Sequence, residues 1–227
     1  MKVWFWLLVI LFLVWWYAKD PITYEKQLSQ PISPKTTVIA LDFHNVMVRT
    51  DISQMLRTFW YQFPGKAFLT FLTHPRAWYE LIKVWWRNKS TEQAFERLEV
   101  RYPELSKLKL FLIKLIACQE PDNRALLLVR ALKGGGYNIY LLSNIWKRAL
   151  QEFLHKFPEF NTLFDGFYIP SADNNFVAKP HPAFYQGFQK YLDRQKQNNK
   201  QIIFIDNSVE NVDNLRNSEM VGVLVNQ

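Results

Sequence analysis

The stretch TVIALDFHNV, residues 37–46, decides the fold class. It begins with a short run of apolar and β-branched residues and then reaches a charged one, Asp42. This is the pattern of a strand that is buried along its length and ends at a polar edge. Similar runs occur at four later places in the chain, namely residues 137–143, 166–171, 201–206 and 222–226. The sequence therefore predicts five buried strands.

Helical patterns separate most of these strands. They cover residues 123–133, which are followed by three glycines that favour a helix end, and residues 145–157 and 181–196. Alternation of helices with buried strands is typical of a parallel sheet covered on both faces. We therefore predict an α/β fold with a Rossmann-like parallel sheet. Ligands in such folds bind beyond the carboxyl ends of the strands.

Residues 50–120 carry no strand signal and read as an all-helical insert. Ser90 and Gln93 have the spacing of a capping box at the start of one of its helices. Residues 51–118 hold 11 Lys and Arg against 6 Asp and Glu, a net charge of +5. We predict a helical cap at 50–120, inserted into a core domain formed by residues 37–49 and 121–227.

The first residues are strongly apolar. An unbroken apolar run between Lys2 and Lys19 would span roughly 22 Å as a helix. We interpret residues 1–18 as an N-terminal hydrophobic helix that anchors the chain in a membrane. The alternative, a cleaved signal peptide, requires small residues at its cleavage site, and the end of this run fits that requirement poorly. Residues 19–36 are polar and rich in proline, which predicts an extended linker. The lysines that flank this run weakly favour an orientation with the catalytic domain on the cytoplasmic side of the membrane.

The overall charge and the single cysteine limit the function further. The net charge of +8 favours anionic ligands without selecting among them. Because Cys118 is the only cysteine, an intrachain disulfide and a cysteine zinc site are excluded.

Polar residues with complementary chemistry follow four predicted strands. Asp42 follows the first strand, Ser143 and Asn144 the second, Lys179 comes after the third, and Asp206 ends the fourth. A carboxylate can attack phosphorus, a hydroxyl can hold phosphoryl oxygens, and a lysine can neutralise the transition state. Two carboxylates at adjacent strand ends can bind Mg²⁺. Each signal is weak alone, but their order on this frame predicts phosphoryl transfer.

With this order of motifs, the chain resembles the haloacid dehalogenase-like hydrolase superfamily, with its helical cap placed after the first motif. The resemblance covers about residues 37–227. It is closest in LFDGFYIPSADNNFVAKPHPAFY (163–185) and FIDNSVENVDNLR (204–216).

This resemblance implies roles for individual residues. Asp42 would be the nucleophile of an aspartyl-phosphate intermediate and also a metal ligand. Asp206 would be the second metal carboxylate, and the backbone carbonyl of His44 would complete the Mg²⁺ site. The phosphate-binding residues would be Ser143, Asn144 and Lys179.

Three positions depart from the phosphatase pattern. His44 stands where that pattern has an acid/base aspartate, Asn45 replaces the following glycine, and Asn207 replaces a second acid. We consider three interpretations of His44. It acts as the acid/base, the domain is weakly active or inactive and only binds a phosphorylated ligand, or Asp42 attacks carbon as in dehalogenases. The retained Asp206 argues against the third.

The sequence thus predicts a membrane-tethered, Mg²⁺-dependent phosphohydrolase that acts on a phosphorylated small molecule. The alternative is a membrane-anchored binding module with little or no catalysis. We expect no nucleic-acid partner.

Overall fold

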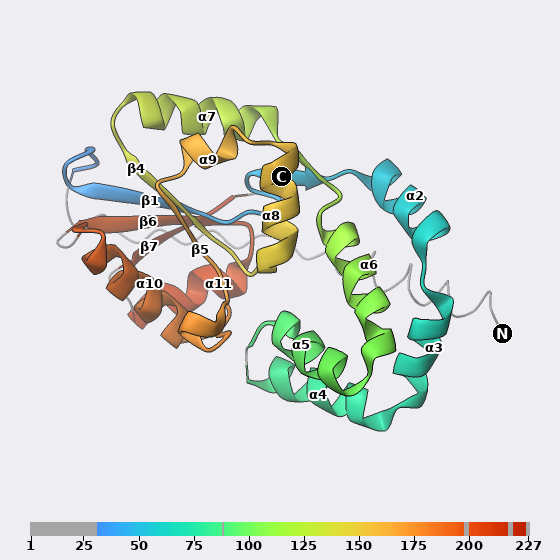
Figure 1. Ribbon diagram of the computed structural model, residues 1–227. Helices are drawn as coiled ribbons and strands as arrows, with labels where there is room; N and C mark the ends of the chain where they lie inside the picture. Colours follow the sequence, from blue (N-terminus) through green and yellow to red (C-terminus); the bar gives the residue numbers. More distant parts are fainter. Residues whose placement is uncertain (1–30, 88, 198–199, 218–219, 226–227) are drawn as a thin grey trace.

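The computed structural model describes residues 31–87, 89–197, 200–217 and 220–225 (Figure 1). Its centre is a five-stranded parallel sheet with strand order β5-β4-β1-β6-β7. The five strands are β1 (Thr37–Leu41), β4 (Asn138–Leu142), β5 (Gly166–Tyr168), β6 (Gln201–Asp206) and β7 (Met220–Leu224). The predicted Rossmann-like parallel sheet is therefore confirmed.

Alternate residues of β1 point to opposite faces of the sheet, as the period of a strand requires. Ile39 and Leu41 belong to a core cluster on one face, and Val38 and Ala40 belong to a second cluster on the other. All five residues of β1 are buried. Because both faces are covered, the strand reads as a continuous apolar run rather than an alternating one.

Helices cover both of these faces (Figure 1). The helices on the side of the first cluster are α7 (Asn123–Gly134), α8 (Lys147–Lys156) and α9 (Phe160–Leu163). On the other side lie α10 (Pro182–Arg194), α11 (Val209–Asp213) and the 3₁₀ helix η3 (Asn214–Asn217). A further short 3₁₀ helix, η2 (Ala172–Asn174), lies between β5 and α10. The helices expected on both faces are present.

Between the first strand and α7 the chain forms the helical insert. Its elements are α2 (Ile52–Gln62), α3 (Gly65–Thr73), α4 (Pro75–Trp86), α5 (Thr91–Arg101), η1 (Pro103–Leu105) and α6 (Ser106–Ile116). Buried side chains of the insert, among them Phe95 and Leu98, belong to the same cluster as one face of the sheet. The insert therefore packs against the sheet domain.

A small antiparallel ribbon joins the insert to the sheet domain. It consists of β2 (Val48–Thr50) and β3 (Gln119–Pro121), with Thr50 paired with Gln119. This ribbon was not predicted from the sequence, because strands of three residues with polar side chains among them carry no strand pattern. The ribbon brings the two ends of the insert together.

The N-terminal prediction requires a correction. Residues 1–18, predicted as a hydrophobic membrane helix, and residues 19–30 of the predicted linker lie outside the described residues. In the part of the chain that is described, no helix is long and apolar enough to span a bilayer. The longest described helix, α10, has 13 residues, whereas a span needs about 20. The predicted single-pass membrane location is therefore withdrawn.

Candidate functional site

Asp42 lies at the carboxyl edge of the sheet, directly after β1. The neighbouring strands place other polar residues beside it, since Leu41 is in register with Leu141 of β4 and with Ile205 of β6. The backbone N–H of Asp42 donates to the carbonyl of Ile205 at 2.9 Å. Parallel strands therefore hold the carboxylate next to the end of β6, as the sequence predicted.

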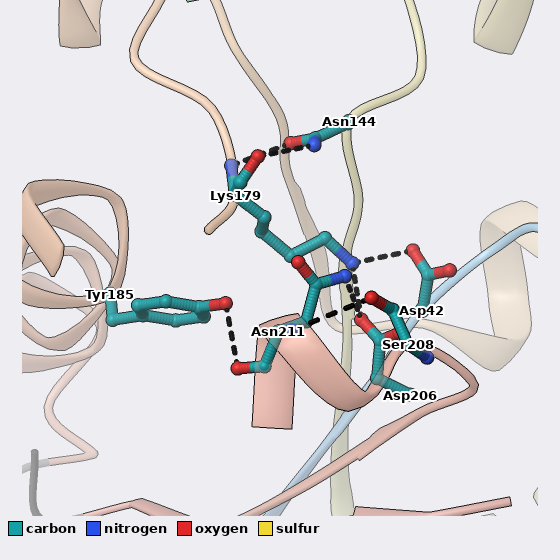
Figure 2. A network of polar contacts seen from close by, with 7 residues as sticks. All are labelled: Asp42, Asn144, Lys179, Tyr185, Asp206, Ser208 and Asn211. Carbon is teal, nitrogen blue, oxygen red and sulfur yellow. Dashed lines mark hydrogen bonds and ion pairs between the residues drawn. The ribbon is translucent and has the colours of Figure 1, made fainter. Parts of the chain in front are cut away.

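One lysine joins the two buried aspartates at this edge. The Nζ of Lys179 donates to Oδ1 of Asp42 and to Oδ2 of Asp206, both at 2.7 Å (Figure 2). All three residues are buried, and Asp206 has no exposed surface. The Nζ of Lys179 also lies 5.0 Å from the ring centre of Phe204. Three residues predicted from separate motifs thus form one ion-paired cluster.

The charges of this cluster depend on one another. Burial alone would lower the pKa of Lys179, but the carboxylates of Asp42 and Asp206 outweigh it and raise that pKa. Burial raises the pKa of the Asp206 carboxyl, and the ammonium of Lys179 opposes the rise. Two carboxylates share one ammonium, so the ionised cluster carries a net negative charge. A buried site of this kind favours an additional cation.

Two further donors hold Asp206 in place. Its Oδ1 accepts the backbone N–H of Ser208 at 2.8 Å, and its Oδ2 accepts the side-chain amide of Asn211 at 2.9 Å. The hydroxyl of Tyr185 donates to the backbone carbonyl of Asn211 at 3.0 Å (Figure 2). None of these three residues was predicted from the sequence. Asn211 could have been suspected, because it lies in the quoted motif that follows Asp206.

Asn144 contacts the backbone of Lys179 on both sides of its side-chain amide. Its Oδ1 accepts the N–H of Lys179, and its Nδ2 donates to the carbonyl of the same residue, each at 2.8 Å (Figure 2). Asn144 was predicted to bind phosphate. Its two polar atoms connect the segment after β4 to the lysine, and its role in binding phosphate stays a prediction.

Ser143 has a buried hydroxyl that is free to donate. Its residue is 1% exposed, and its Oγ has no hydrogen-bond partner among the described residues. The backbone N–H of Ser143 donates to the carbonyl of Tyr168 on β5 at 3.2 Å. A buried hydroxyl without a partner is costly unless a ligand completes its bonding. Ser143 therefore fits its predicted role in binding an anionic oxygen.

The ring of His44 packs edge-on against Phe43, with ring centres 5.2 Å apart. Burial lowers the pKa of His44; the nearby Asp42 carboxylate opposes this, the Lys179 ammonium reinforces it, and the Gln119 side chain opposes it. Asn45 has a φ of 56°, in the region that glycine favours and asparagine tolerates.

The predicted Mg²⁺ ligands are Asp42, Asp206 and the backbone carbonyl of His44. The two carboxylates face one another across the Nζ of Lys179, which is ion-paired with both. Among the described residues, no three His, Cys, Asp or Glu side chains form a metal-binding cluster. A pair of carboxylates fits Mg²⁺, which keeps several of its waters, better than a metal that needs an all-protein shell.

Several solved structures have a similar fold. A haloacid dehalogenase-family enzyme from Bacteroides thetaiotaomicron aligns at a TM-score of 0.57 and 16% identity over 84% of this chain and 94% of that one. A haloacid dehalogenase-like hydrolase from Streptococcus pneumoniae aligns at 0.51 and 18%, over 85% of each chain. This protein has the haloacid dehalogenase-like fold. The resemblance predicted from the sequence is therefore confirmed.

Relatives with this fold do not all carry out one reaction. The L-2-haloacid dehalogenase from Xanthobacter autotrophicus, solved with chloropropionic acid covalently bound, aligns at a TM-score of 0.53 and 15% identity over 83% of this chain and 76% of that one. At such identities the similarity shows the haloacid dehalogenase-like fold alone. The chemistry has to be argued from the site.

One curated protein is similar in sequence. The sesquiterpene phosphatase astK of Aspergillus oryzae is 31% identical over 106 residues. The match covers 47% of this chain and 51% of that protein, so the two correspond over about half of their lengths. No protein-family model matches this sequence.

Proposed function

We propose that this protein is a Mg²⁺-dependent phosphohydrolase that cleaves a phosphate monoester through an aspartyl-phosphate on Asp42. The observation that carries the proposal is the convergence of Asp42, Lys179 and Asp206 at 2.7 Å contacts. The same sheet edge carries, after β4, the Ser143 hydroxyl, which has no partner among the described residues. This arrangement joins a nucleophile, a positive charge and a hydrogen-bond donor at one sheet edge. Those are the groups that phosphoryl transfer needs.

In the first half of the reaction, a carboxylate oxygen of Asp42 attacks phosphorus. The bond between phosphorus and the leaving oxygen breaks, and protonated His44 gives its proton to that oxygen. The phosphoryl group is then held by Asp42 as an acyl phosphate. In the second half, neutral His44 takes a proton from water, the water oxygen attacks phosphorus, and Asp42 is released together with inorganic phosphate.

The other residues bind and orient the phosphoryl group. The hydroxyl of Ser143 donates to one phosphoryl oxygen, and the ammonium of Lys179 neutralises negative charge in the transition state. Asn144 fixes the backbone of Lys179 through its two hydrogen bonds. We therefore assign Asn144 to the phosphate site as a positioning residue.

Asp42, Asp206 and the backbone carbonyl of His44 would hold the Mg²⁺. When bound, the ion supplies positive charge that lessens repulsion between the Asp42 carboxylate and the anionic phosphate. The surplus negative charge of the cluster supports this assignment. The Bacteroides thetaiotaomicron enzyme has been solved in complex with magnesium and inorganic phosphate, at a TM-score of 0.55 and 16% identity.

The domain boundaries follow the same proposal. We take residues 37–49 and 121–227 as the catalytic core and residues 50–120 as its cap. The similarity to a sesquiterpene phosphatase suggests a monophosphate of an apolar alcohol as the first substrate to test.

The test is hydrolysis of p-nitrophenyl phosphate, acetyl phosphate and a sesquiterpenyl monophosphate by the full chain. Activity should require Mg²⁺, and Asp42→Asn should lower it by about 10⁴-fold or more, because the nucleophile is lost. Asp193→Asn, an exposed aspartate on α10, is the matched control and should leave the rate unchanged. Activity that survives in Asp42→Asn would refute the proposed mechanism.

A second candidate function is a binding module for a phosphorylated ligand. The observation that favours it is the lowered pKa of His44, which disfavours the protonated form that the first step requires. This alternative predicts that inorganic phosphate binds to the wild-type chain while no substrate is turned over. Mg²⁺-dependent release of phosphate from any of the three substrates excludes it.

A further inference from the structure

Helix α8 starts three residues after the predicted phosphate-binding pair Ser143 and Asn144, and it has no cap of its own. Its N-cap residue, Trp146, makes no side-chain hydrogen bond to the helix. The first N–H groups of a helix have no partner within the helix, and they carry a partial positive charge. Another part of the chain has to satisfy them.

The helical insert supplies the missing acceptor. The Oε2 of Glu92, near the start of α5, accepts the backbone N–H of Lys147 at 3.0 Å. The neighbouring Thr91 accepts the indole N–H of Trp146 through its Oγ1 at 3.2 Å. Glu92 is 5% exposed. Burial raises the pKa of its carboxyl, and the bond from Lys147 opposes that rise.

The two residues before Thr91 contact a second segment of the core. The backbone N–H of Ser90 donates to the carbonyl of Phe176 at 2.8 Å, and Lys89 forms an isolated bridge with Val177. The Nζ of Lys89 also donates to Oδ1 of Asn175 at 3.0 Å. These contacts end two residues before Lys179.

These contacts change the predicted capping box at the start of α5. The Oγ of Ser90 accepts the N–H of Glu92, as an N-cap should. The reciprocal bond from Gln93 is not formed, because the N–H of Ser90 bonds to Phe176 instead. The Oε1 of Gln93 is left without a partner among the described residues. At the start of α5, a hydrogen bond to the core therefore replaces one of the two bonds of the capping box.

Residues 89–92, which we call the docking segment, thus contact both segments that carry the predicted phosphate site. One is residues 143–147 and the other is residues 175–179. Asn144 already joins these two segments to each other through the backbone of Lys179. The docking segment completes a closed set of contacts around them.

We propose that Glu92 is a positioning residue: through the start of α8 it holds Ser143, Asn144 and Lys179 in the arrangement that binds phosphate. The position of the helical insert is thereby coupled to the site. This inference rests on the proposed function, since it concerns the same phosphate site. Glu92 acts through the backbone of α8 and is not itself a catalytic residue.

The first test is the affinity of the full chain for inorganic phosphate with Mg²⁺, measured by calorimetry. Glu92→Ala should weaken binding about ten- to a hundred-fold, because a charge-assisted hydrogen bond that orders the site is lost. Glu92→Gln keeps an acceptor and should recover part of the affinity. The matched control is Glu96→Ala, an exposed glutamate one turn along α5, which should bind as the wild type does.

A second variant removes the donor instead of the acceptor. Lys147→Pro deletes the N–H that Glu92 accepts, at the first position of α8, where proline is well tolerated. Trp146 has φ −66° and ψ 138°, which suits a residue before proline. Lys147→Ala keeps the N–H and is the control. Lys147→Pro should weaken phosphate binding, whereas Lys147→Ala should not.

Hydrogen exchange separates this inference from the proposed function. Glu92→Ala and Lys147→Pro should both speed amide exchange in residues 143–146 and 175–179, whether or not the chain hydrolyses any substrate. Unchanged exchange or unchanged phosphate affinity in both variants overturns the positioning role. A wild-type chain that binds no phosphate overturns the proposed function and this inference with it. In that case, faster exchange in the two variants would still show that the contact between Glu92 and α8 supports the structure.

Discussion

The carboxyl edge of the sheet and the helical insert differ in their side chains: the sheet edge buries charged ones, and the insert exposes large apolar ones. At the sheet edge, Asp42, Lys179 and Asp206 are buried and paired with one another. In the insert, large apolar side chains are exposed, with Trp60 and Tyr61 at 81% and Trp86 at 78%. Glu92 is the buried charged residue among the insert's described residues, and its carboxylate bonds to the core.

The difference shows where this sequence is constrained. A buried charge survives only with a partner, so the residues of the sheet edge depend on one another. The exposed apolar residues of α2 and α4 contribute little to the fold, because they remain in contact with water. Substitutions in the two regions should therefore have very different effects.

The largest effect is expected from Lys179→Met, which leaves two buried carboxylates facing each other. The free energy of unfolding should fall by about 3–5 kcal/mol, measured by urea denaturation in the presence of a chelator. Lys190→Met, on the exposed side of α10, is the control. Added Mg²⁺ should restore part of the loss in Lys179→Met. A loss below about 1 kcal/mol would show that the pairs are not the main support of this edge.

The next effect, measured on activity, is expected from His44→Ala. If the imidazole is the acid/base, turnover of an alkyl phosphate should fall by about 10²–10⁴-fold. Turnover of p-nitrophenyl phosphate should fall much less, because its leaving group needs little protonation. Steady-state kinetics on both substrates, with the exposed His155→Ala as control, measure the contrast. Equal losses on the two substrates would assign His44 another role.

The smallest effect is expected at the exposed apolar residues of the insert. Trp60→Ser should change the free energy of unfolding by no more than about 0.5 kcal/mol, since the side chain is exposed. Phe71→Ala, at a residue 6% exposed in the same insert, should cost about 3–5 kcal/mol. Both are measured by urea denaturation. A large loss in Trp60→Ser would mean that its ring is covered in the folded chain.

The sequence predicted the sheet well, because a strand buried on both faces leaves a continuous apolar run. All five strands were expected, and the last, β7, lies two residues earlier than predicted. Asp42 and Asp206 were also expected to lie together, because residues at the carboxyl ends of parallel strands meet at one edge. The place of Lys179, in the loop after β5, was implied only by the family resemblance.

Contacts between distant segments were not predictable in the same way. The ribbon of β2 and β3 depends on backbone pairing across the whole insert and leaves no pattern in three residues. Likewise, nothing in the local sequence shows that Asn144 bonds to the backbone of Lys179 or that Glu92 caps α8. Such contacts are chosen by tertiary packing.

The strand order also has a consequence for how the chain acquires its fold. β1 is the central strand, yet its partner β4 is synthesised about a hundred residues after it, and its other partner, β6, later still. Pairings of such long sequence separation form slowly. Until residue 206 has been made, a nascent chain carries an apolar strand with at least one open edge, which is an aggregation hazard. The last of the ion-paired residues to be synthesised, Asp206, thus belongs to the strand that closes this edge.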